Sequence, residues 1–266
     1  MITGAEKSIK VIIGTPVNRE HAYILDKFLD NQKQIQQAYP GCELVMATSE
    51  KDYAPELEGM LRARQLRGKA LTHTPMKPDY ARHWVWDVAS AREALRCYAV
   101  SQAHADYLLF LDADMLFEAD VVSDMLAHIS GCDALFSGYA LREHGIGLAG
   151  AGCLMLRRRV FERVRFRCYE FPSGEVMFED NLLELDLFRL HARVRKGIYI
   201  ATDHYQDAGS FKRTRPQKVG KIRELANRPF IRYVLVKSSL ALRYNIPWRL
   251  KIIMDRLDRI NKRKDQ

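Results

Sequence analysis

Two carboxylates that follow an apolar run are the residues in this sequence best suited to chemistry. Asp112 and Asp114 come directly after 107–111, YLLFL, which is apolar at every position. In an extended chain, side chains two positions apart point to the same side, so both carboxylates reach one site. Adjacent anions at an apolar strand end repel each other unless a cation or solvent compensates. Because Mg²⁺-type ions are bound by one or two carboxylates together with phosphate oxygens, the pattern predicts a divalent-cation site; a solvated acidic turn is the alternative.

The element that must position these carboxylates is a strand covered on both faces, because an all-apolar strand is typical of a parallel sheet between helices. Strand and helix patterns alternate along the chain, which predicts an α/β fold. In open α/β sheets, ligands bind at the carboxyl ends of the strands, where Asp112 and Asp114 are expected. The expected strands are 9–14, 43–48, 70–73, 107–111, 133–140, 151–156 and 197–201, and the expected helices are 22–38, 57–66, 88–104 and 179–192.

Five segments resemble, in the same order, those of family 2-type glycosyltransferases with the GT-A fold. Residues 88–115, VASAREALRCYAVSQAHADYLLFLDADM, are similar to the helix and strand that precede the family's Asp-x-Asp motif. The others are the first strand and turn at 11–20, a glycine-containing strand and short helix at 147–166, a Glu-Asp pair that opens a helix at 178–183, and a histidine at a strand end at 199–204. Together they span roughly residues 9–205.

The resemblance implies a GT-A catalytic domain over residues 1–211, with a mostly parallel sheet flanked by helices. It implies an enzyme that moves a sugar from a UDP- or GDP-linked donor to the hydroxyl of a carbohydrate or lipid-linked acceptor, with Mn²⁺ or Mg²⁺ as cofactor. In an inverting reaction, Asp180 would deprotonate that hydroxyl. By the same resemblance, Asp112, Asp114 and His204 bind the metal, Thr15, Pro16, Asn18, Arg19, Arg92 and Asp112 bind the donor nucleotide, and Glu179 and Asp180 are catalytic.

These roles make chemical sense, and several have a structural alternative. A cation on Asp114 would stabilise the departing diphosphate as a Lewis acid, and a carboxylate is a suitable base for a sugar hydroxyl. Glu179 and Asp180 equally suit the first turn of a helix, where acidic side chains complement the macrodipole. His204 equally suits a polar surface segment. Residues 47–52, ATSEKD, differ from the family's Asp-Asp-Gly-Ser-like segment, which leaves the nucleobase open.

The positive charge of the chain is concentrated in its last part. Overall, 42 basic and 33 acidic residues give a net charge of +9. Residues 212–266 hold 17 basic and 4 acidic residues and so carry +13, whereas residues 1–211 carry −4. Because the pattern also becomes helical beyond Lys212, we expect a basic, helical C-terminal extension at 212–266.

Within this extension, the sequence RLKIIMDRLDRINKRK from Arg249 predicts a basic amphipathic helix. Most of its basic residues lie off the apolar stripe, as in helices that bind an anionic membrane surface. The same stripe equally suits packing on the protein's own core or on a second subunit. It consists of Leu250, Ile253, Met254, Leu257 and Ile260.

Two other kinds of function remain as alternatives to glycosyl transfer. Nucleotidyltransferases that make nucleotide sugars carry a glycine-rich, basic signature after the first strand, whereas residues 14–18, GTPVN, hold one glycine. The basic extension suits a non-catalytic protein that binds nucleic acid or a membrane surface. No helix-turn-helix, zinc or single-strand-binding signature accompanies it, so we expect no nucleic-acid partner.

Cysteine usage and hydropathy indicate the expected compartment. The five cysteines are widely spaced and form no C-x-x-C pair, so we expect buried free thiols in a reducing compartment. No apolar stretch approaches the roughly 18–20 residues of a membrane span, and MITGAEKSIK lacks the apolar core of a secretory signal. The expected location is the cytoplasm, with peripheral contact to the inner face of the membrane through the extension.

Overall fold

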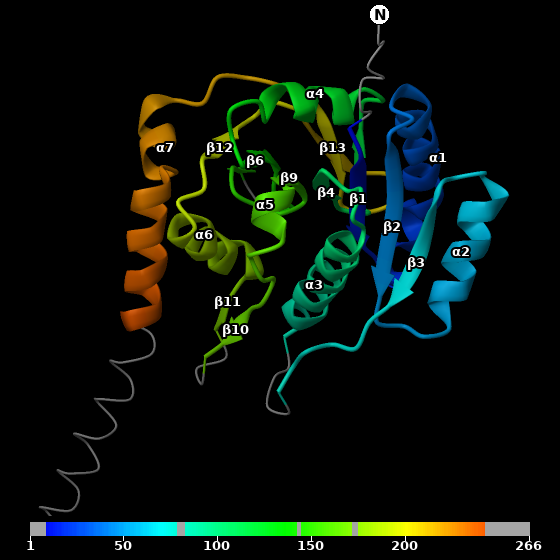
Figure 1. Ribbon diagram of the computed structural model, residues 1–266, viewed down its shortest axis with the longest axis horizontal. Helices are drawn as coiled ribbons and strands as arrows, with labels where there is room; N and C mark the ends of the chain where they lie inside the picture. The colour runs from blue at the N-terminus through cyan, green and yellow to red at the C-terminus, as the bar shows by residue number, and fades with distance from the viewer. Residues whose placement is uncertain (1–8, 79–82, 143–144, 172–174, 243–266) are drawn as a thin grey trace, which may run out of the picture.

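The computed structural model describes residues 9–78, 83–142, 145–171 and 175–242, and its central element is a mostly parallel sheet (Figure 1). Seven strands of the described residues form this sheet in the order β12-β6-β9-β4-β1-β2-β3, and β9 runs antiparallel to its neighbours β4 and β6. The α/β class expected from the sequence, with a mostly parallel sheet, is confirmed. The strands are β1 (Val11–Pro16), β2 (Cys42–Thr48), β3 (Gly68–Thr72), β4 (Tyr107–Leu111), β6 (Ala134–Ser137), β9 (Cys153–Arg157) and β12 (Val194–Gly197).

Helices cover both faces of the sheet, which gives the body three layers (Figure 1). Side chains of α1, α2 and α4 pack on one face, and those of α3, α5 and α6 pack on the other. The helices expected at 22–38, 57–66, 88–104 and 179–192 are all present, with ends shifted by a few residues. The helices are α1 (Ala22–Ala38), α2 (Tyr53–Ala63), α3 (Val85–Ser101), α4 (Val121–His128), α5 (Arg158–Phe161), α6 (Glu179–Arg189) and α7 (Lys221–Ala226), and a 3₁₀ turn, η1, spans Arg19–His21.

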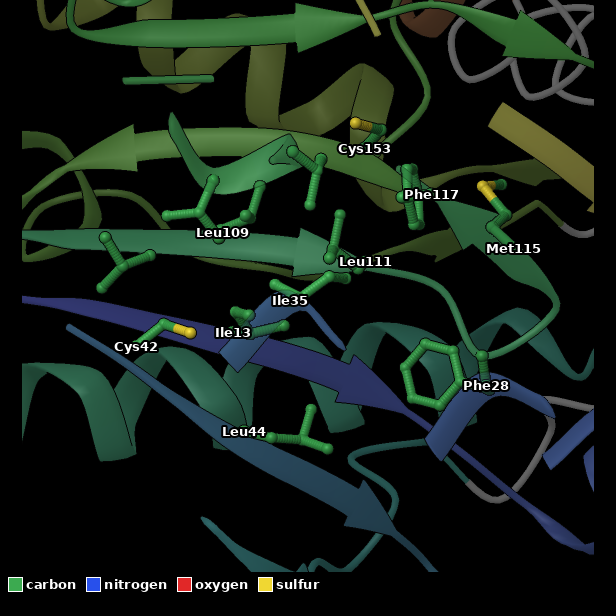
Figure 2. Packing of buried hydrophobic residues seen from close by; sticks show 14 of the residues in the cluster. Ile13, Phe28, Ile35, Cys42, Leu44, Leu109, Leu111, Met115, Phe117 and Cys153 are labelled. Atoms are coloured by element: carbon green, nitrogen blue, oxygen red, sulfur yellow. The ribbon is translucent and has the colours of Figure 1, made fainter. Parts of the chain in front are cut away.

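Strand β4 shows why the sheet needs helices on both sides. Leu109 and Leu111 pack into the layer of α1, α2 and α4, whereas Leu108 and Phe110 pack into the layer of α3, α5 and α6. Figure 2 shows the first of these layers, where the β4 leucines lie beside Ile13 of β1. Burial of apolar surface stabilises a fold by about 25 cal/mol per Å². Because β4 is buried on both faces, it is a firmly held support for the residues that follow it.

Short strands beyond the main sheet complete the fold. β5 (Met115–Phe117), β13 (Thr202–Tyr205) and β14 (Phe211–Thr214) form a three-stranded antiparallel sheet. Two strand pairs, β7 (Tyr139–Ala140) with β8 (Ile146–Gly147) and β10 (Tyr169–Glu170) with β11 (Val176–Met177), are also antiparallel.

Two strand predictions in the second half need correction. The strand expected at 197–201 is wrong, because β12 ends at Gly197, β13 begins at Thr202, and residues 198–201 belong to neither. Between them, the N–H groups of Tyr199 and Ile200 donate to the Ser137 hydroxyl at 3.2 and 3.1 Å, which replaces a strand ladder. The strand expected at 133–140 is split into β6 and β7.

The C-terminal segment is helical over much of its described length, but not from its start. Residues 212–214 belong to β14, so the boundary expected after residue 211 falls within a strand. Helix α7 follows, and residues 229–242 are helical and lie along α6 (Figure 1). The amphipathic helix predicted from Arg249 lies outside the described residues. None of the helices in the described ranges has the length and apolar character needed to cross a membrane.

The cysteine prediction is correct for burial at four positions and wrong at one. All five thiols are free, and Cys97 is exposed on α3. Burial raises the pKa of Cys42 to about 11 and that of Cys168 to about 12, which suppresses the reactive thiolate of both. The four buried cysteines are Cys42, Cys132, Cys153 and Cys168.

Asn31 on α1 offers a test of how the fold fixes the chain after the two aspartates. Its buried side-chain amide donates to the Phe117 carbonyl at 2.7 Å and accepts from the Phe117 N–H at 3.0 Å. Asn31→Ala leaves both groups of β5 without a partner, so we expect a loss of about 2–4 kcal/mol in the free energy of unfolding by urea. Lys33→Ala on the exposed side of α1 should change it by less than about 0.5 kcal/mol. A cost near zero for Asn31→Ala would contradict this account.

Candidate active site

The carboxyl ends of β1, β2 and β4 meet at one edge of the sheet, and the predicted site residues lie there. The three strands are parallel and adjacent, so the segments that follow them emerge side by side. Asp112 follows β4 directly, and Thr15 and Pro16 are the last residues of β1. The hydroxyl of Thr15 donates to the Leu111 carbonyl at 2.8 Å, which ties the two strand ends together.

Asp112 is held close to the start of β9. Its backbone N–H donates to the Gly152 carbonyl at 3.1 Å. A Cβ atom at Gly152 would lie 2.6 Å from Asp112 Oδ2 and 2.8 Å from the Tyr139 hydroxyl, so a side chain here would displace both groups. The glycine-containing strand noted in the sequence thus shapes the surroundings of the first aspartate.

Arg92 on α3 joins two parts of the predicted site. Its guanidinium forms ion pairs with Asp112, at 2.6 Å, and with Glu179 at the start of α6. The Arg92 and Glu179 side chains are 5% and 6% exposed, so this pair lies in the interior. Burial alone would lower the pKa of Arg92, but the charges of the two carboxylates raise it. The guanidinium therefore stays charged. The structure therefore places Arg92 between Asp112 and Glu179, and its contact with a donor nucleotide remains a prediction.

Asp114 is surrounded by positive and hydrogen-bonding groups. Arg142 pairs with its Oδ2 atom, and His204 Nε2 lies 3.3 Å from the same oxygen. Burial alone would raise the pKa of Asp114, but the hydrogen bonds and charges of His204 and Arg142 hold it at about 2. Asp114 is therefore a carboxylate at neutral pH.

The orientation of His204 suits metal binding. Its Nδ1 lies 2.6 Å from the Ala140 carbonyl, and because a carbonyl only accepts, Nδ1 carries the proton. Nε2 then faces Asp114, and a cation bound between them would take the place of the Nε2 proton, as in metal sites where a backbone carbonyl fixes the histidine. An imidazole nitrogen and a carboxylate oxygen form an incomplete ligand set for Mn²⁺ or Mg²⁺. Within the described ranges, no group of three or more His, Cys, Asp or Glu side chains is arranged to hold a metal, so phosphate oxygens would have to complete this site.

Glu179 and Asp180 form the first turn of α6, as the sequence predicts. Glu179 is turned inward to Arg92, whereas Asp180 is partly exposed and accepts the Asn181 N–H at 2.6 Å. Burial, and then the charges of Glu179 and Glu184, raise the pKa of Asp180 to about 7. A carboxyl group with a pKa near neutrality accepts protons readily, which is the property required of a general base.

An aromatic cluster lies next to this turn. Trp84 precedes α3 and Phe178 precedes α6, and these residues are 61% and 39% exposed. Their ring centroids are 6.2 Å apart, and the His83 ring lies 5.3 Å from Trp84 and 5.9 Å from Phe178. Phe178 lies two residues before Asp180, so these exposed aromatic rings provide a surface suited to a sugar ring next to it.

The remaining donor candidates lie at the same edge but differ in their surroundings. Asn18 precedes η1, and its Oδ1 atom is buried with no hydrogen-bond partner among the described residues; Arg92 Nε is in the same situation. Arg19 is exposed and forms ion pairs with Glu50, Asp52 and Glu56 in the segment after β2 and the start of α2.

Two residues of this site were missed in the sequence. Arg142 lies beyond β7 and pairs with Asp114, 28 positions earlier. The Tyr139 hydroxyl accepts the Gly152 N–H at 3.3 Å, and burial beside Asp112 raises the pKa of Tyr139 well above its ordinary value. Neither residue lies in a recognisable motif, and only the tertiary structure brings them to the aspartates.

The sequence matches no protein-family model and no curated protein. Solved structures with a similar arrangement include the mannosyltransferase PcManGT from Pyrobaculum calidifontis with GDP-Man and Mn²⁺, at 12% identity and a TM-score of 0.49, over 91% of this chain and 73% of that one. S. aureus TarS 1–349 in complex with UDP-GlcNAc is 13% identical, with a TM-score of 0.47, over 89% of this chain and 68% of that one. A197 from STIV is 13% identical, with a TM-score of 0.40, over 80% and 97%. At TM-scores below 0.5, these similarities assign no function to this chain.

The raised pKa of Asp180 predicts a pH-dependent effect on stability. Its folded pKa is about 7, against about 3.9 for an unfolded aspartate. Between these values the folded chain binds more protons than the unfolded chain, so this group lowers stability as the pH rises from about 4 to about 7. Asp180→Asn keeps the shape of the neutral carboxyl. It should therefore raise the free energy of unfolding by roughly 1–3 kcal/mol at about pH 8 and leave it nearly unchanged at about pH 4.

Asp186→Asn on the same helix is the matched control. Asp186 accepts hydrogen bonds from Arg167 at 2.6 and 2.9 Å, so its replacement removes favourable contacts and should not stabilise the protein at pH 8. Chemical denaturation of both variants at the two pH values checks the prediction. An equal effect of Asp180→Asn at both pH values would show that Asp180 is an ordinary helix-start carboxylate.

Proposed function

We propose that this chain is a metal-dependent glycosyltransferase of the GT-A type, with residues 1–211 as the catalytic domain. The sugar would pass from a UDP- or GDP-linked donor to an acceptor hydroxyl with inversion. The observation that supports this best is the bridge that Arg92 makes between Asp112 and Glu179. It joins the Asp-x-Asp segment to the Glu179–Asp180 turn, so a group suited to bind a diphosphate and a group suited to take a proton share one edge of the sheet.

On the donor side, Asp114 and His204 would hold Mn²⁺ or Mg²⁺, with Asp112 next to them. When bound, the cation supplies Lewis-acid stabilisation of the departing diphosphate. The half-exposed guanidinium of Arg142, next to Asp114, is available to phosphate oxygens. Asn18 Oδ1 and Arg92 Nε support a polar ligand at this edge, because a buried polar atom without a partner is costly until something pairs with it.

On the acceptor side, Asp180 would take the proton of the attacking hydroxyl. Its pKa of about 7 makes it a far better proton acceptor than an ordinary aspartate. Glu179 is committed to Arg92 and so acts by fixing the first turn of α6 rather than by moving a proton. Trp84 and Phe178 would stack on an acceptor sugar, because carbohydrate rings present apolar faces to aromatic side chains.

We propose a cytoplasmic location, with the extension at 212–266 in peripheral contact with the inner face of the membrane.

The metal site is tested by nucleotide-dependent thermal stabilisation. UDP or GDP with Mn²⁺ should raise the unfolding temperature of the wild type, since a ligand that binds only the folded state stabilises it. Asp114→Asn keeps the size of the side chain but removes its charge, and it should lose this metal-dependent rise. Asp124→Asn, an exposed residue on α4, should keep it. An unchanged metal-dependent rise in Asp114→Asn would move the site elsewhere.

The role of Asp180 is tested by separating binding from turnover. Asp180→Asn should keep the affinity for donor nucleotide, measured by the same thermal shift, and should lose sugar transfer by roughly 10²-fold or more. Asp120→Asn, at the exposed start of α4, is the control for a helix-start aspartate and should transfer sugar at the wild-type rate. Near-normal transfer by Asp180→Asn would leave this residue a structural role only.

A further inference from the structure

The helical segment at 229–242 has an outer face that is apolar and exposed. We define the outer face as Phe230, Val234, Leu235 and Leu242, and these residues are 63%, 41%, 51% and 57% exposed. Phe230 and Val234 are four positions apart, and Leu235 and Leu242 are seven apart, so they form two adjacent rows on one side of a helix. Helix α7, just before this segment, exposes Ile222 and Leu225 at 87% and 49%. Contiguous exposed apolar side chains on a helix mark a binding surface.

The opposite face of the segment is firmly attached to the body. Val236 is buried against Leu182 and Leu185 of α6. Arg232 pairs with Glu184 at 3.1 Å and donates to Asn181 at 2.8 Å. Because these contacts hold the inner side on α6, the segment cannot rotate to bury its outer face in the body. Figure 1 shows this segment beside α6, with α7 leading into it, at the edge of the molecule far from α1 and α2.

The charge around the outer face is positive. Residues 218–242 hold six basic residues and one acidic residue, Glu224. Arg232 is paired with Glu184, and the other five basic side chains are exposed without an ion pair in the part of the chain that the structure describes. These five are Lys218, Lys221, Arg223, Arg228 and Lys237.

This charge selects among the partners that would cover the apolar rows. Residues 243–266 hold eight basic and three acidic residues, so the chain's own end would bring positive charge to a positive surface. A second copy docking through the same face would do the same. An anionic lipid surface supplies both a negative potential and an apolar layer for Phe230 and its neighbours.

We propose that the outer face docks on a bilayer that contains anionic phospholipid. Asn181, which Arg232 holds from this segment, is next to Asp180 at the start of α6. The docked surface and the proposed base are thus on one helix and its immediate neighbour. If the proposed glycosyl transfer is correct, this arrangement favours an acceptor presented at the membrane surface, and the docking itself can be measured without any transfer.

The experiment is sedimentation of the full chain with vesicles, without nucleotide. Wild type should sediment with vesicles of phosphatidylcholine and phosphatidylglycerol, and at least about tenfold less with phosphatidylcholine alone or at high salt, because anionic headgroups attract the basic residues. V234E/L235E places two carboxylates on the outer face and should lower binding to anionic vesicles by about tenfold or more. Q34E/Q37E adds the same charge on exposed positions of α1 and should bind nearly as the wild type does.

Folding and oligomeric state separate the outcomes. Both variants should unfold at the wild-type temperature and show the wild-type thermal shift with nucleotide and Mn²⁺, since neither changes a residue of the candidate site. Equal vesicle binding by V234E/L235E and the wild type, or no binding by the wild type, overturns the proposal. If the wild type is a dimer that does not bind vesicles and V234E/L235E is a monomer, the membrane proposal is overturned. The outer face would then be the contact between two copies of the chain. If the wild type and both variants all fail to bind nucleotide, the proposed function is contradicted, but the proposal of vesicle docking is not affected.

Discussion

The buried guanidinium of Arg92 is the interaction on which the candidate site depends. It lies between Asp112, at the end of β4, and Glu179, at the start of α6, and these segments are 67 positions apart in the chain. A buried charge that loses its partners is strongly destabilising, so α3, β4 and α6 can keep their positions only together. The apolar layers on both faces of the sheet fix the direction of each element. The ion pairs of Arg92 fix which of their ends meet.

The surroundings of this edge of the sheet also give two of its aspartates, Asp114 and Asp180, different pKa values. Arg92 is paired with Asp112 and Glu179, and its charge lowers the pKa of Asp180 only slightly. Burial and the negative charges of Glu179 and Glu184 outweigh it, and the pKa of Asp180 rises to about 7. Asp114 is buried too, but it faces Arg142 and His204, and its pKa falls to about 2. Carboxyl groups whose surroundings move their pKa values in opposite directions are suited to different tasks, one to hold positive charge and one to accept a proton.

The parts of this structure that sequence could predict are those fixed by local pattern. The bounds of β4 follow from a run of apolar residues with no polar interruption, and the place of Asp112 and Asp114 follows from β4. Arg142 and Tyr139 could not be predicted, because their relation to the aspartates arises only from long-range contacts in the fold. The strand expected at 197–201 is absent for a similar reason: the Ser137 hydroxyl takes the hydrogen bonds that a neighbouring strand would otherwise take. Long-range contacts override local pattern at such positions.

Glu184 connects the candidate base to the C-terminal segment. Its buried carboxylate accepts from Lys196 at 2.6 Å and pairs with Arg232 at 3.1 Å, and it also contributes to the raised pKa of Asp180. Burial lowers the pKa of Lys196, so the charge of this amine depends on staying close to Glu184. Because Arg232 comes from the 229–242 segment, the position of that segment on α6 helps to set the negative charge that Asp180 experiences. The segment that carries the exposed apolar face therefore also shapes the electrostatics of the site, through one carboxylate shared between them.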